Sequence, residues 1–434
     1  MKIAWFTPLS IGSAIGRASA SIAAELATLA EVEVCYFDTG EVRQIKAPSK
    51  RFSSADGVSE RALSRYDFVF YNLGNNLPYH REIYLLSRRH PGICVLHDVV
   101  MHHFFAAYYL EELRDAPALA RLMERLYGEK GRKASGKGIW ETPEVTDFPL
   151  FEEAIAGATG VITHSAFFKE RVQRVFPGPV HHIPLPYDAD LRPAAMPRQK
   201  LIAPGELLIV TVGHVNPNKQ VDAVIRALAR SGSGRRYTYA VLGHCSPEYK
   251  LRLQQLAHKL RIADRVQILG SASDDLLHTY LQHADICVAL RYPVTEGASA
   301  SVIEEMLFGK PVIVNEIGFY AELPDDCVVK TPCNDEDALA MALKNLMEDD
   351  SRRISMGSAA QIYAKREFRA DRYAREAVDF AWEATGAQHL LHLADRVAAE
   401  FTRMRVAADM PVVDRISSIC EDLFSGKRPT HSGK

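Results

Sequence analysis

Short apolar runs alternate with helical patterns twice along this chain, and that alternation is what most constrains its fold. In the first half the apolar runs cover residues 3–6, 32–37, 68–71, 93–96, 160–162 and 182–185. In the second half they cover residues 207–212, 239–242, 266–269, 286–290, 312–314 and 328–329. The segments between them show helical spacing, as at Val221, Val224, Ile225 and Leu228. Strands that alternate with helices form parallel sheets, so we predict two doubly wound α/β domains.

A stretch without periodicity separates the two halves and carries three prolines between residues 187 and 205. Such a composition is typical of a linker between domains. We therefore predict an N-terminal domain at 1–190, a linker at 191–204, a C-terminal domain at 205–365, further helices at 366–425 and a flexible polar tail at 426–434. The further helices are expected to pack partly on the first domain and to offer a surface for a homodimer.

Charge and cysteine usage exclude some classes of protein. The chain has 52 basic and 54 acidic residues, a balance that argues against a nucleic-acid binder. Its seven cysteines form no CxxC pair and several lie in apolar runs, which favours a reducing compartment. We found no run of 18 apolar residues and no pattern typical of a signal peptide. These features predict a cytoplasmic protein, with peripheral contact to the inner membrane face left open.

The most informative polar pattern is the carboxylate pair Glu296 and Glu304, which lies between the predicted strands at 286–290 and 312–314. The pair flanks a loop of small residues that opens a helix. The free N–H groups and the dipole of a helix start favour anionic ligands such as phosphate. Carboxylates beside such a site accept hydrogen bonds from hydroxyl groups, so the pattern predicts a ribose and a sugar next to a phosphate.

A second loop in the same half carries a candidate cation. Gly213-His-Val-Asn-Pro-Asn-Lys219 follows the predicted strand at 207–212 and precedes a helix. Gly213 allows a close approach of the backbone to a ligand. Lys219 would reach a diphosphate and stabilise it as a leaving group. The alternative is a solvated lysine at a helix start, where its charge opposes the dipole.

The sequence around the glutamate pair consists of Glu-Gly, six residues and Glu at 296–304, followed by Gly-Lys-Pro-Val at 309–312. This sequence resembles the donor-site pattern of the family-4 retaining glycosyltransferases, the glycosyl transferases group 1 type. The resemblance implies the GT-B fold, in which two Rossmann-like domains face a central cleft. It implies that Glu304 binds the ribose hydroxyls and that Glu296 contacts the donor sugar. The further donor-binding positions that it implies are Gly213, His214, Gly270, Gly297, Ala298 and Ser299.

The chain departs from that family at one donor position. His214 stands where the family usually has arginine, and an imidazole is mostly neutral at pH 7. Arg291 is the candidate to supply the missing charge. Gly297, Ala298 and Ser299 would offer backbone N–H groups to the sugar and phosphate, and Gly270 would line the base pocket.

Polar residues at strand ends of the first half predict the acceptor side. Gly12 and Gly16 lie in the loop after the first strand, where the resemblance implies contact with phosphates or the leaving group. Asn75 follows the strand at 68–71. His97 and Asp98 follow the strand at 93–96, and strand ends are where a doubly wound fold binds its ligand. We expect His97 to touch the donor sugar and acceptor, and Asp98 to fix its tautomer or bind acceptor hydroxyls.

Two other interpretations concern metals and membranes. His97, Asp98, His102 and His103 offer metal ligands, but their spacing is not the i, i+4 pair of a helical zinc site, and we expect no metal. Residues 128–138 form a basic, glycine-rich segment before Trp140. We interpret it as a loop that is either simply solvated or, through 128–140, in contact with a membrane surface or a lipid diphosphate.

The sequence therefore predicts a metal-independent retaining glycosyltransferase without a cofactor. It would transfer a hexose of the mannose or glucose type from a GDP- or UDP-sugar to a glycan or lipid-linked saccharide, in cell-surface polysaccharide synthesis. One alternative is a GT-B sugar-nucleotide epimerase or phosphorylase. The other is a non-catalytic partner of another transferase, favoured by His214 and by the long helical tail.

Overall fold

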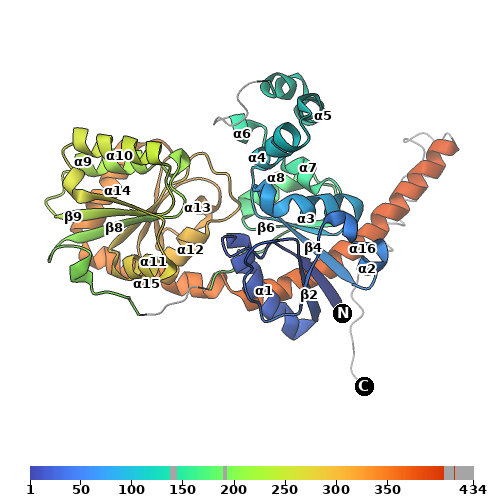
Figure 1. Cartoon of the computed structure of the whole chain (residues 1–434), viewed down its shortest axis with the longest axis horizontal. Coiled ribbons are helices and arrows are strands. Elements are labelled where there is room, and N and C mark those ends of the chain that lie inside the picture. The colour runs from blue at the N-terminus through green and yellow to red at the C-terminus, as the bar shows by residue number, and fades with distance from the viewer. Residues whose placement is uncertain (137–143, 189–192, 405–414, 416–434) are drawn as a thin grey trace.

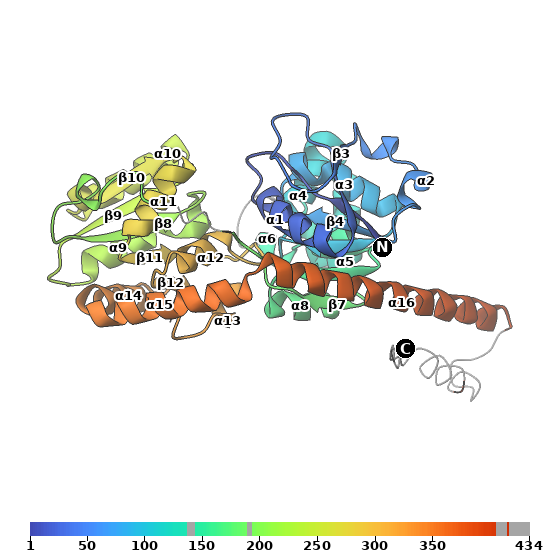
Figure 2. The same cartoon turned by 90° about the horizontal axis from the view of Figure 1, so that it is seen from below.

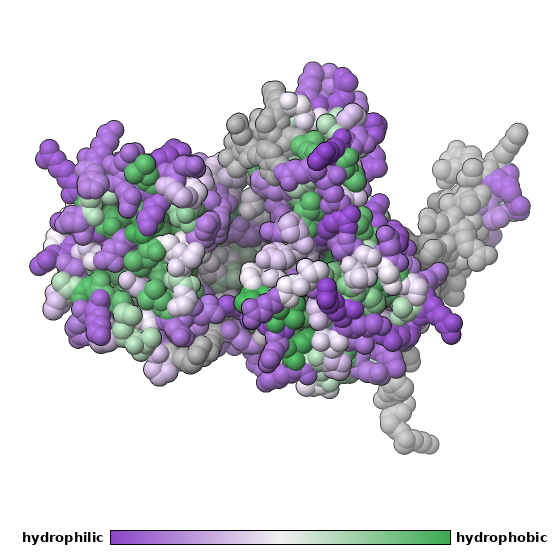
Figure 3. Space-filling model, viewed as in Figure 1, coloured by the Kyte–Doolittle hydropathy of each residue, from purple (hydrophilic) through white to green (hydrophobic). Residues whose placement is uncertain are grey.

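The computed structural model of the chain describes residues 1–136, 144–188, 193–404 and 415. These residues form two α/β domains side by side, each built on one parallel sheet with helices packed on it (Figure 1). The predicted fold class, two doubly wound Rossmann-like domains, is confirmed. The surface is hollowed between the domains (Figure 3).

The first sheet has seven strands in the order β3-β2-β1-β4-β5-β6-β7. The strands are β1 (Lys2–Phe6), β2 (Glu31–Tyr36), β3 (Ser49–Arg51), β4 (Phe68–Leu73), β5 (Ile93–Leu96), β6 (Gly160–Thr163) and β7 (Val180–His182). The helices are α1 (Ala14–Leu29), α2 (Glu60–Leu63), α3 (Leu77–Arg89), α4 (His102–Ala106), α5 (Ala116–Ala134), α6 (Glu144–Asp147), α7 (Phe151–Ile155) and α8 (Ala166–Gln173). Two details differ from the prediction: the polar edge strand β3 gave no apolar signal, and the last strand ends at His182 instead of starting there.

The second sheet has six strands in the order β10-β9-β8-β11-β12-β13. The strands are β8 (Leu207–Val212), β9 (Tyr237–Leu242), β10 (Val266–Gly270), β11 (Ile286–Ala289), β12 (Val312–Asn315) and β13 (Val328–Thr331). The helices are α9 (Val221–Arg230), α10 (Pro247–Lys259), α11 (Asp274–His283), α12 (Ala300–Leu307), α13 (Phe319–Glu322), α14 (Glu336–Glu348) and α15 (Asp350–Glu367). The strand order reverses at β1/β4 in one sheet and at β8/β11 in the other, which is where such folds bind ligands.

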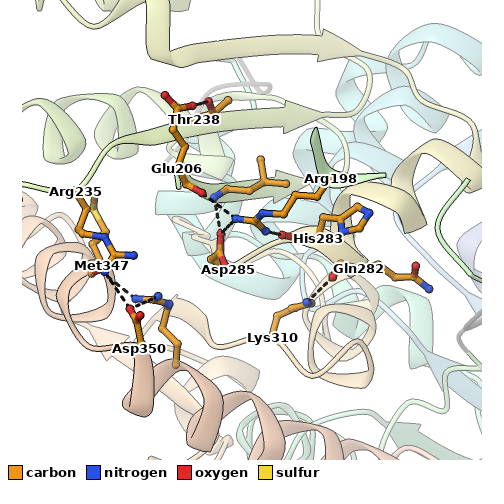
Figure 4. Close-up of polar contacts among 12 residues, drawn as sticks. Arg198, Glu206, Arg235, Thr238, Gln282, His283, Asp285, Lys310, Met347 and Asp350 are labelled. Atoms are coloured by element: carbon orange, nitrogen blue, oxygen red, sulfur yellow. Dashed lines mark hydrogen bonds and ion pairs between the residues drawn. The ribbon is translucent and has the colours of Figure 1, made fainter. Parts of the chain in front are cut away.

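Part of the predicted linker is packed onto the second domain. Leu201 and Ile202 are buried in its core. Arg198 donates to the carbonyl oxygen of Glu206 at 2.9 Å and forms an ion pair with Asp285, whose carboxylate also accepts the N–H of Leu208 at 2.7 Å (Figure 4). The second domain is therefore anchored to the chain that precedes residue 205.

The last described helix, α16 (Ala370–Arg403), continues beyond α15 and lies along the first domain (Figure 2). Its buried residues share one core with the first sheet and include Tyr373, Ala377, Phe380 and Ala384. A Cβ on Gly160 of β6 would lie 2.9 Å from the Cβ of Ala384, so glycine there allows the close packing. The chain thus crosses between the domains twice, and the N–H of Tyr187 on the first crossing donates to the carbonyl oxygen of Phe368 on the second at 3.1 Å.

The basic segment that we predicted to be a loop is largely helical, so that prediction was wrong. Helix α5 runs to Ala134, with a non-helical Gly128 (φ +66°) inside it. Lys133 pairs with Glu129 at 2.9 Å, which leaves less free charge than the sequence suggested. Residues 137–143 and most of 405–434, including the end of the predicted helices and the tail, lie outside the described residues. None of the helices in the described ranges combines the length and apolar character needed to cross a bilayer.

Removing the side chain that fixes α16 should destabilise the first domain. Phe380 is 2% exposed and stacks on His181 with ring centroids 5.6 Å apart. We expect Phe380→Ala to lower the free energy of unfolding by about 3–5 kcal/mol, through lost burial and a cavity. Urea unfolding followed by circular dichroism measures it, with the exposed Ile354→Ala as control (71% exposed). Equal unfolding midpoints for the two variants would contradict the docking of α16.

Candidate active site

Two loops pair across the domain boundary and bring the site residues together. The carbonyl oxygen of His97, after β5, accepts the N–H of Gly297, after β11, at 2.8 Å. The N–H of Val100 donates to the carbonyl oxygen of Thr295 at 3.1 Å, and Asp98 is bridged to Glu296 in an antiparallel arrangement. The loops after the central strands of the two sheets are therefore joined as a short ladder.

An interdomain cavity of about 280 Å³ lies beside this ladder. It is lined by Gly12, Ser13, Ala14, Ile15, Ala18, Asn75, Asn76, Tyr79, His80, His97, Asp98, His164, Leu185, Tyr187, Glu296, Ala298 and Ala300. The predicted site residues from both domains that meet here are Gly12, Asn75, His97, Asp98, Glu296 and Ala298. The cavity is thus formed jointly by the two predicted halves of the site.

His97 is buried in the cavity wall and held at both ring nitrogens. Its Nε2 faces Oδ1 of Asn72 at 3.0 Å, and Nδ2 of Asn72 donates to the carbonyl oxygen of Phe6, which orients that amide. Its Nδ1 faces Nε2 of His164 at 3.1 Å, while Nδ1 of His164 faces the carbonyl oxygen of Ile183. Burial lowers the pKa of both imidazoles, to about 4 for His164. Two neutral rings carry two ring protons for these three contacts, so one of the three contacts lacks a proton.

Of the two roles predicted for Asp98, fixing the tautomer of His97 does not fit, because the ring of His97 contacts Asn72 and His164 instead. Binding of acceptor hydroxyls by Asp98 stays a prediction. Oδ2 of Asp98 accepts the N–H of Asn75 at 2.6 Å. Burial raises the pKa of Asp98 to about 7, and the nearby Glu296 adds to the rise. Asp98 therefore exchanges a proton near neutral pH on the cavity wall.

Asn75 lines the cavity and also holds the loop that follows β5. Its Oδ1 accepts the N–H of Phe104 at 2.9 Å, and its Nδ2 lies 3.1 Å from Nδ1 of His103. Nδ1 of His102 lies 2.7 Å from the carbonyl oxygen of Phe148. These contacts position the loop on which His97 and Asp98 lie.

Glu296 is a fixed anion at the second-domain side of the cavity. It accepts hydrogen bonds from Nε of Arg291 at 2.7 Å and from the hydroxyl of Tyr320 at 2.5 Å. Burial opposes its ionisation, but Arg291 and Tyr320 outweigh that effect and the pKa of Glu296 is lowered. Nη1 of Arg291 is buried and has no hydrogen-bond partner among the described residues. The Nη1 group of Arg291 is thus available as a cationic donor, beside the Glu296 carboxylate, which can accept hydrogen bonds from hydroxyl groups.

Lys219 lies inside the second domain, behind the loop that carries Gly213. Its Nζ donates to the carbonyl oxygen of Val212, and the side chain is 2% exposed. Burial lowers the pKa of Lys219 and raises that of Glu305, the nearby acid in α12. Within the described chain neither carboxylate oxygen of Glu305 has a hydrogen-bond partner. The predicted contact with a diphosphate would require the ammonium group to leave this interior position.

Gly213 has the positive φ of +101°, and a Cβ there would lie 2.8 Å from Nζ of Lys219. Glycine at this position therefore makes room for the lysine. His214 is exposed and stacks on His244 at 5.3 Å. The pKa of His214 is lowered, first by burial and then by His244, Arg291 and Lys219 in that order. His214 is therefore neutral here, and Arg291 is the permanent cation.

Glu304 is buried in α12, with one oxygen 3.2 Å from Nε2 of His278. Burial raises its pKa, against the effects of Tyr187, His278 and Arg17. Arg17, from α1, donates to the hydroxyl of Tyr187 at 3.3 Å and pairs with Asp274 at 3.0 Å. The proposed ribose carboxylate therefore lies among residues from both domains and from the first crossing.

The small residues have distinct positions. The N–H of Gly297 is used by the interdomain ladder, so the prediction that it faces a sugar or phosphate was wrong for this structure. Ser299 caps α12, its Oγ accepting the N–H of Val302 at 3.4 Å. A Cβ on Gly16 would meet the carbonyl oxygen of Pro8 at 2.5 Å, so this glycine serves packing within the first domain. Gly270 ends β10 with φ +78°, and its carbonyl oxygen accepts the N–H of Gly243 at 2.8 Å.

Several site residues were missed by the sequence analysis. His164 follows β6 directly, so the strand-end rule that selected His97 could have found it. Tyr187, at the start of the aperiodic stretch 187–205, and Arg17 were not selected as site residues. Across the ranges that the structure covers, we found no group of three or more histidine, cysteine or acidic side chains placed to hold a metal ion.

The proton on Asp98 should change stability with pH. The pKa is about 7 in the folded state against an ordinary 3.8, so the folded state keeps a proton that the unfolded state loses. The free energy of unfolding should therefore fall by roughly 1–3 kcal/mol as pH rises from about 4 to about 7. Asp98→Asn, which keeps the acceptor for Asn75, should remove that fall. Urea unfolding of both proteins across this pH range measures it, and identical pH profiles would contradict the assignment.

Comparison with known proteins agrees with this geometry. Residues 194–363 match the family model "Glycosyl transferases group 1". D-inositol 3-phosphate glycosyltransferase of Nocardia farcinica is 31% identical over 123 residues, 27% of each chain. The enzyme of that name from Xylanimonas cellulosilytica is 30% identical over 207 residues, 46% of this chain and 48% of the relative. The chain thus spans about half or less of the length of the curated relatives it matches.

Solved structures share the whole architecture at low identity. HepE of Anabaena, solved with UDP and glucose, has a TM-score of 0.60 and 17% identity, and the match covers 88% of this chain and 99% of that one. Sucrose-phosphate synthase of Thermosynechococcus elongatus has a TM-score of 0.63 and 16% identity, covering 89% and 100%. Such identities show the fold alone. The chain therefore has the GT-B fold, and its second domain is similar to the glycosyl transferases group 1 family.

Proposed function

We propose that this protein is a retaining glycosyltransferase that moves a hexose of the glucose or mannose type from a UDP- or GDP-sugar to a glycan or lipid-linked saccharide, without a metal. The observation that carries the proposal is the joint cavity, where the ionised Glu296 of one domain faces the wall that His97 of the other domain forms. The D-inositol 3-phosphate glycosyltransferases and the UDP-bound HepE, to which the chain is similar, support a nucleotide-sugar donor.

The described residues suggest how the donor would lie. Glu304 would accept hydrogen bonds from the ribose, and Glu296 from the hydroxyls of the sugar. The free Nη1 of Arg291 would donate to a phosphate oxygen, a charge-assisted contact that takes over the role of the family arginine absent at 214. The short ladder between the loops would keep water from the sugar.

Retention without a covalent glycosyl-enzyme intermediate requires attack on the sugar from the face that the diphosphate leaves. In our proposal the departing diphosphate accepts the acceptor proton, while Arg291 and the start of α12 stabilise its charge. Both ring nitrogens of His97 already face partners within the first domain, Asn72 and His164, so we assign it a packing and orienting role beside the sugar. Cell-surface polysaccharide synthesis is the proposed setting.

Titration calorimetry with UDP and GDP tests the donor, and hydrolysis of UDP-glucose and GDP-mannose tests the chemistry. Binding of one nucleotide with slow release of the free sugar supports a transferase. A nucleotide sugar converted into its epimer would support the epimerase instead, and binding without any turnover would support the non-catalytic partner. If neither UDP nor GDP binds at millimolar concentration, the proposed function is wrong.

Glu304→Ala should weaken nucleotide binding by about tenfold or more, because a hydrogen bond to a charged group contributes about 1.5–3 kcal/mol. Calorimetry with the preferred nucleotide measures the change. The exposed Glu348→Ala is the matched control and should bind like the wild type. Equal affinities in all three proteins would remove Glu304 from the ribose site.

Lys219→Met should lower turnover by about 10²-fold if the ammonium group moves to the leaving diphosphate. Methionine keeps most of the buried volume, so the fold can be checked by thermal unfolding before activity is compared. The exposed Lys259→Met is the control. Unchanged turnover in Lys219→Met would show that the lysine remains a buried structural group.

A further inference from the structure

A second interdomain cavity, of about 660 Å³, lies along the same second-domain loop as the active site. Tyr292 and Val294 line this second cavity, whereas Glu296 and Ala298 line the first. We call it the aromatic groove and define it by Phe167, Arg171, Asn218, Gln220, Tyr292 and Asn334. Its volume is within the range of about 300–1,000 Å³ of small-molecule sites.

Two aromatic rings from different domains are left partly open to this groove. Phe167 and Tyr292 are each 39% exposed, unusual for large rings that lie beside a cleft. The start of α8, which carries Phe167, is fixed because Glu322 of the second domain accepts the N–H groups of Ala166 at 3.0 Å and Phe167 at 2.6 Å. The N–H of Tyr292 donates to the carbonyl oxygen of Asn218 at 2.8 Å. The backbone that carries each ring is therefore fixed by hydrogen bonds.

The polar lining of the groove includes three amide side chains and four charged ones whose charges cancel. Nε2 of Gln220 donates to Oδ1 of Asn334 at 2.9 Å, while Oδ1 of Asn218 is buried and has no partner within the described structure. The charged lining residues are two cations and two carboxylates: Arg171, Arg226, Asp222 and Glu336. The last three form one network, with Arg226 2.9 Å from Asp222 and 2.6 Å from Glu336. A neutral ligand suits this lining better than a phosphate.

Amide groups between two exposed rings match the chemistry of a neutral oligosaccharide. The apolar face of a pyranose buries its C–H groups on an aromatic ring, and its hydroxyls pair with amides. Asn218 is adjacent to Lys219, and Tyr292 lies four residues before Glu296, so a chain of sugars here would lie along the active-site loop.

We propose that the aromatic groove binds the neutral oligosaccharide part of the acceptor, with sugar rings packed on Phe167 and Tyr292. This inference rests on the proposed function, because it names the substrate class that the transferase would extend. The acceptor is thus an oligosaccharide held by both domains.

Titration calorimetry on the full chain tests the groove with maltotetraose, cellotetraose and mannotetraose, each at up to about 10 mM, a range that detects millimolar dissociation constants. At least one tetraose should bind. Phe167→Ala and Tyr292→Ala should each weaken that binding by about tenfold, through loss of the stacking ring. Tyr292→Phe, which keeps the ring, should retain it, as should the control Met341→Ala, a 63% exposed side chain elsewhere on the second domain.

UDP and GDP are titrated in parallel to separate the two proposals. If a nucleotide binds and no tetraose does, the groove proposal fails and the proposed function stands. If a tetraose binds equally well to Phe167→Ala, Tyr292→Ala and the wild type, the groove proposal also fails. If a tetraose binds with the expected loss in the variants but no nucleotide binds, the groove is a saccharide site and the transferase assignment fails.

Discussion

The active-site geometry depends on the short backbone ladder between the loops after β5 and β11. The hydrogen bond from Gly297 to His97 joins two loops that belong to separate cores, and the bond between Val100 and Thr295 extends it. Glycine is required at 297 because a Cβ there would lie 2.8 Å from the carbonyl oxygen of His97. With this contact in place, one domain completes the cavity that the other begins, and both sets of polar side chains face the same volume.

Buried charge is the second constraint on the site. Lys219, Glu304 and Glu305 are all less than 5% exposed within one small region of the second domain. Burying an ionised group is costly unless it is paired, and Glu305 has both oxygens unsatisfied in the described structure. A polyanionic ligand would raise the pKa of Lys219 and so favour its charged form, which suits this region of the second domain to a ligand that brings negative charge.

Much of the fold could be predicted because its strands are short apolar runs, such as Ile93–Leu96, buried on both faces of parallel sheets. The position of His97 and Glu296 followed from the rule that ligands bind at strand ends. The burial of Lys219 and the use of the Gly297 N–H could not be predicted, because they depend on the loop path and on how the domains meet. Strand β3 was missed since Ser49–Arg51 pairs through its backbone alone. His214 was singled out from the sequence as a departure from the family pattern, and its exposure and stacking became clear only in the structure.

The two crossings between the domains have a mechanical consequence. A single connection would let the domains swivel in any direction, but here two connections run together and are joined by the bond between Tyr187 and Phe368. A double connection of this kind favours rotation of the domains about one axis and resists rotation about the others. If the domains part, the two connections would guide them back along the same path, so that the ladder between His97 and Gly297 reforms in register. Tyr187, which lies at this hinge and lines the cavity, would sense that rotation directly.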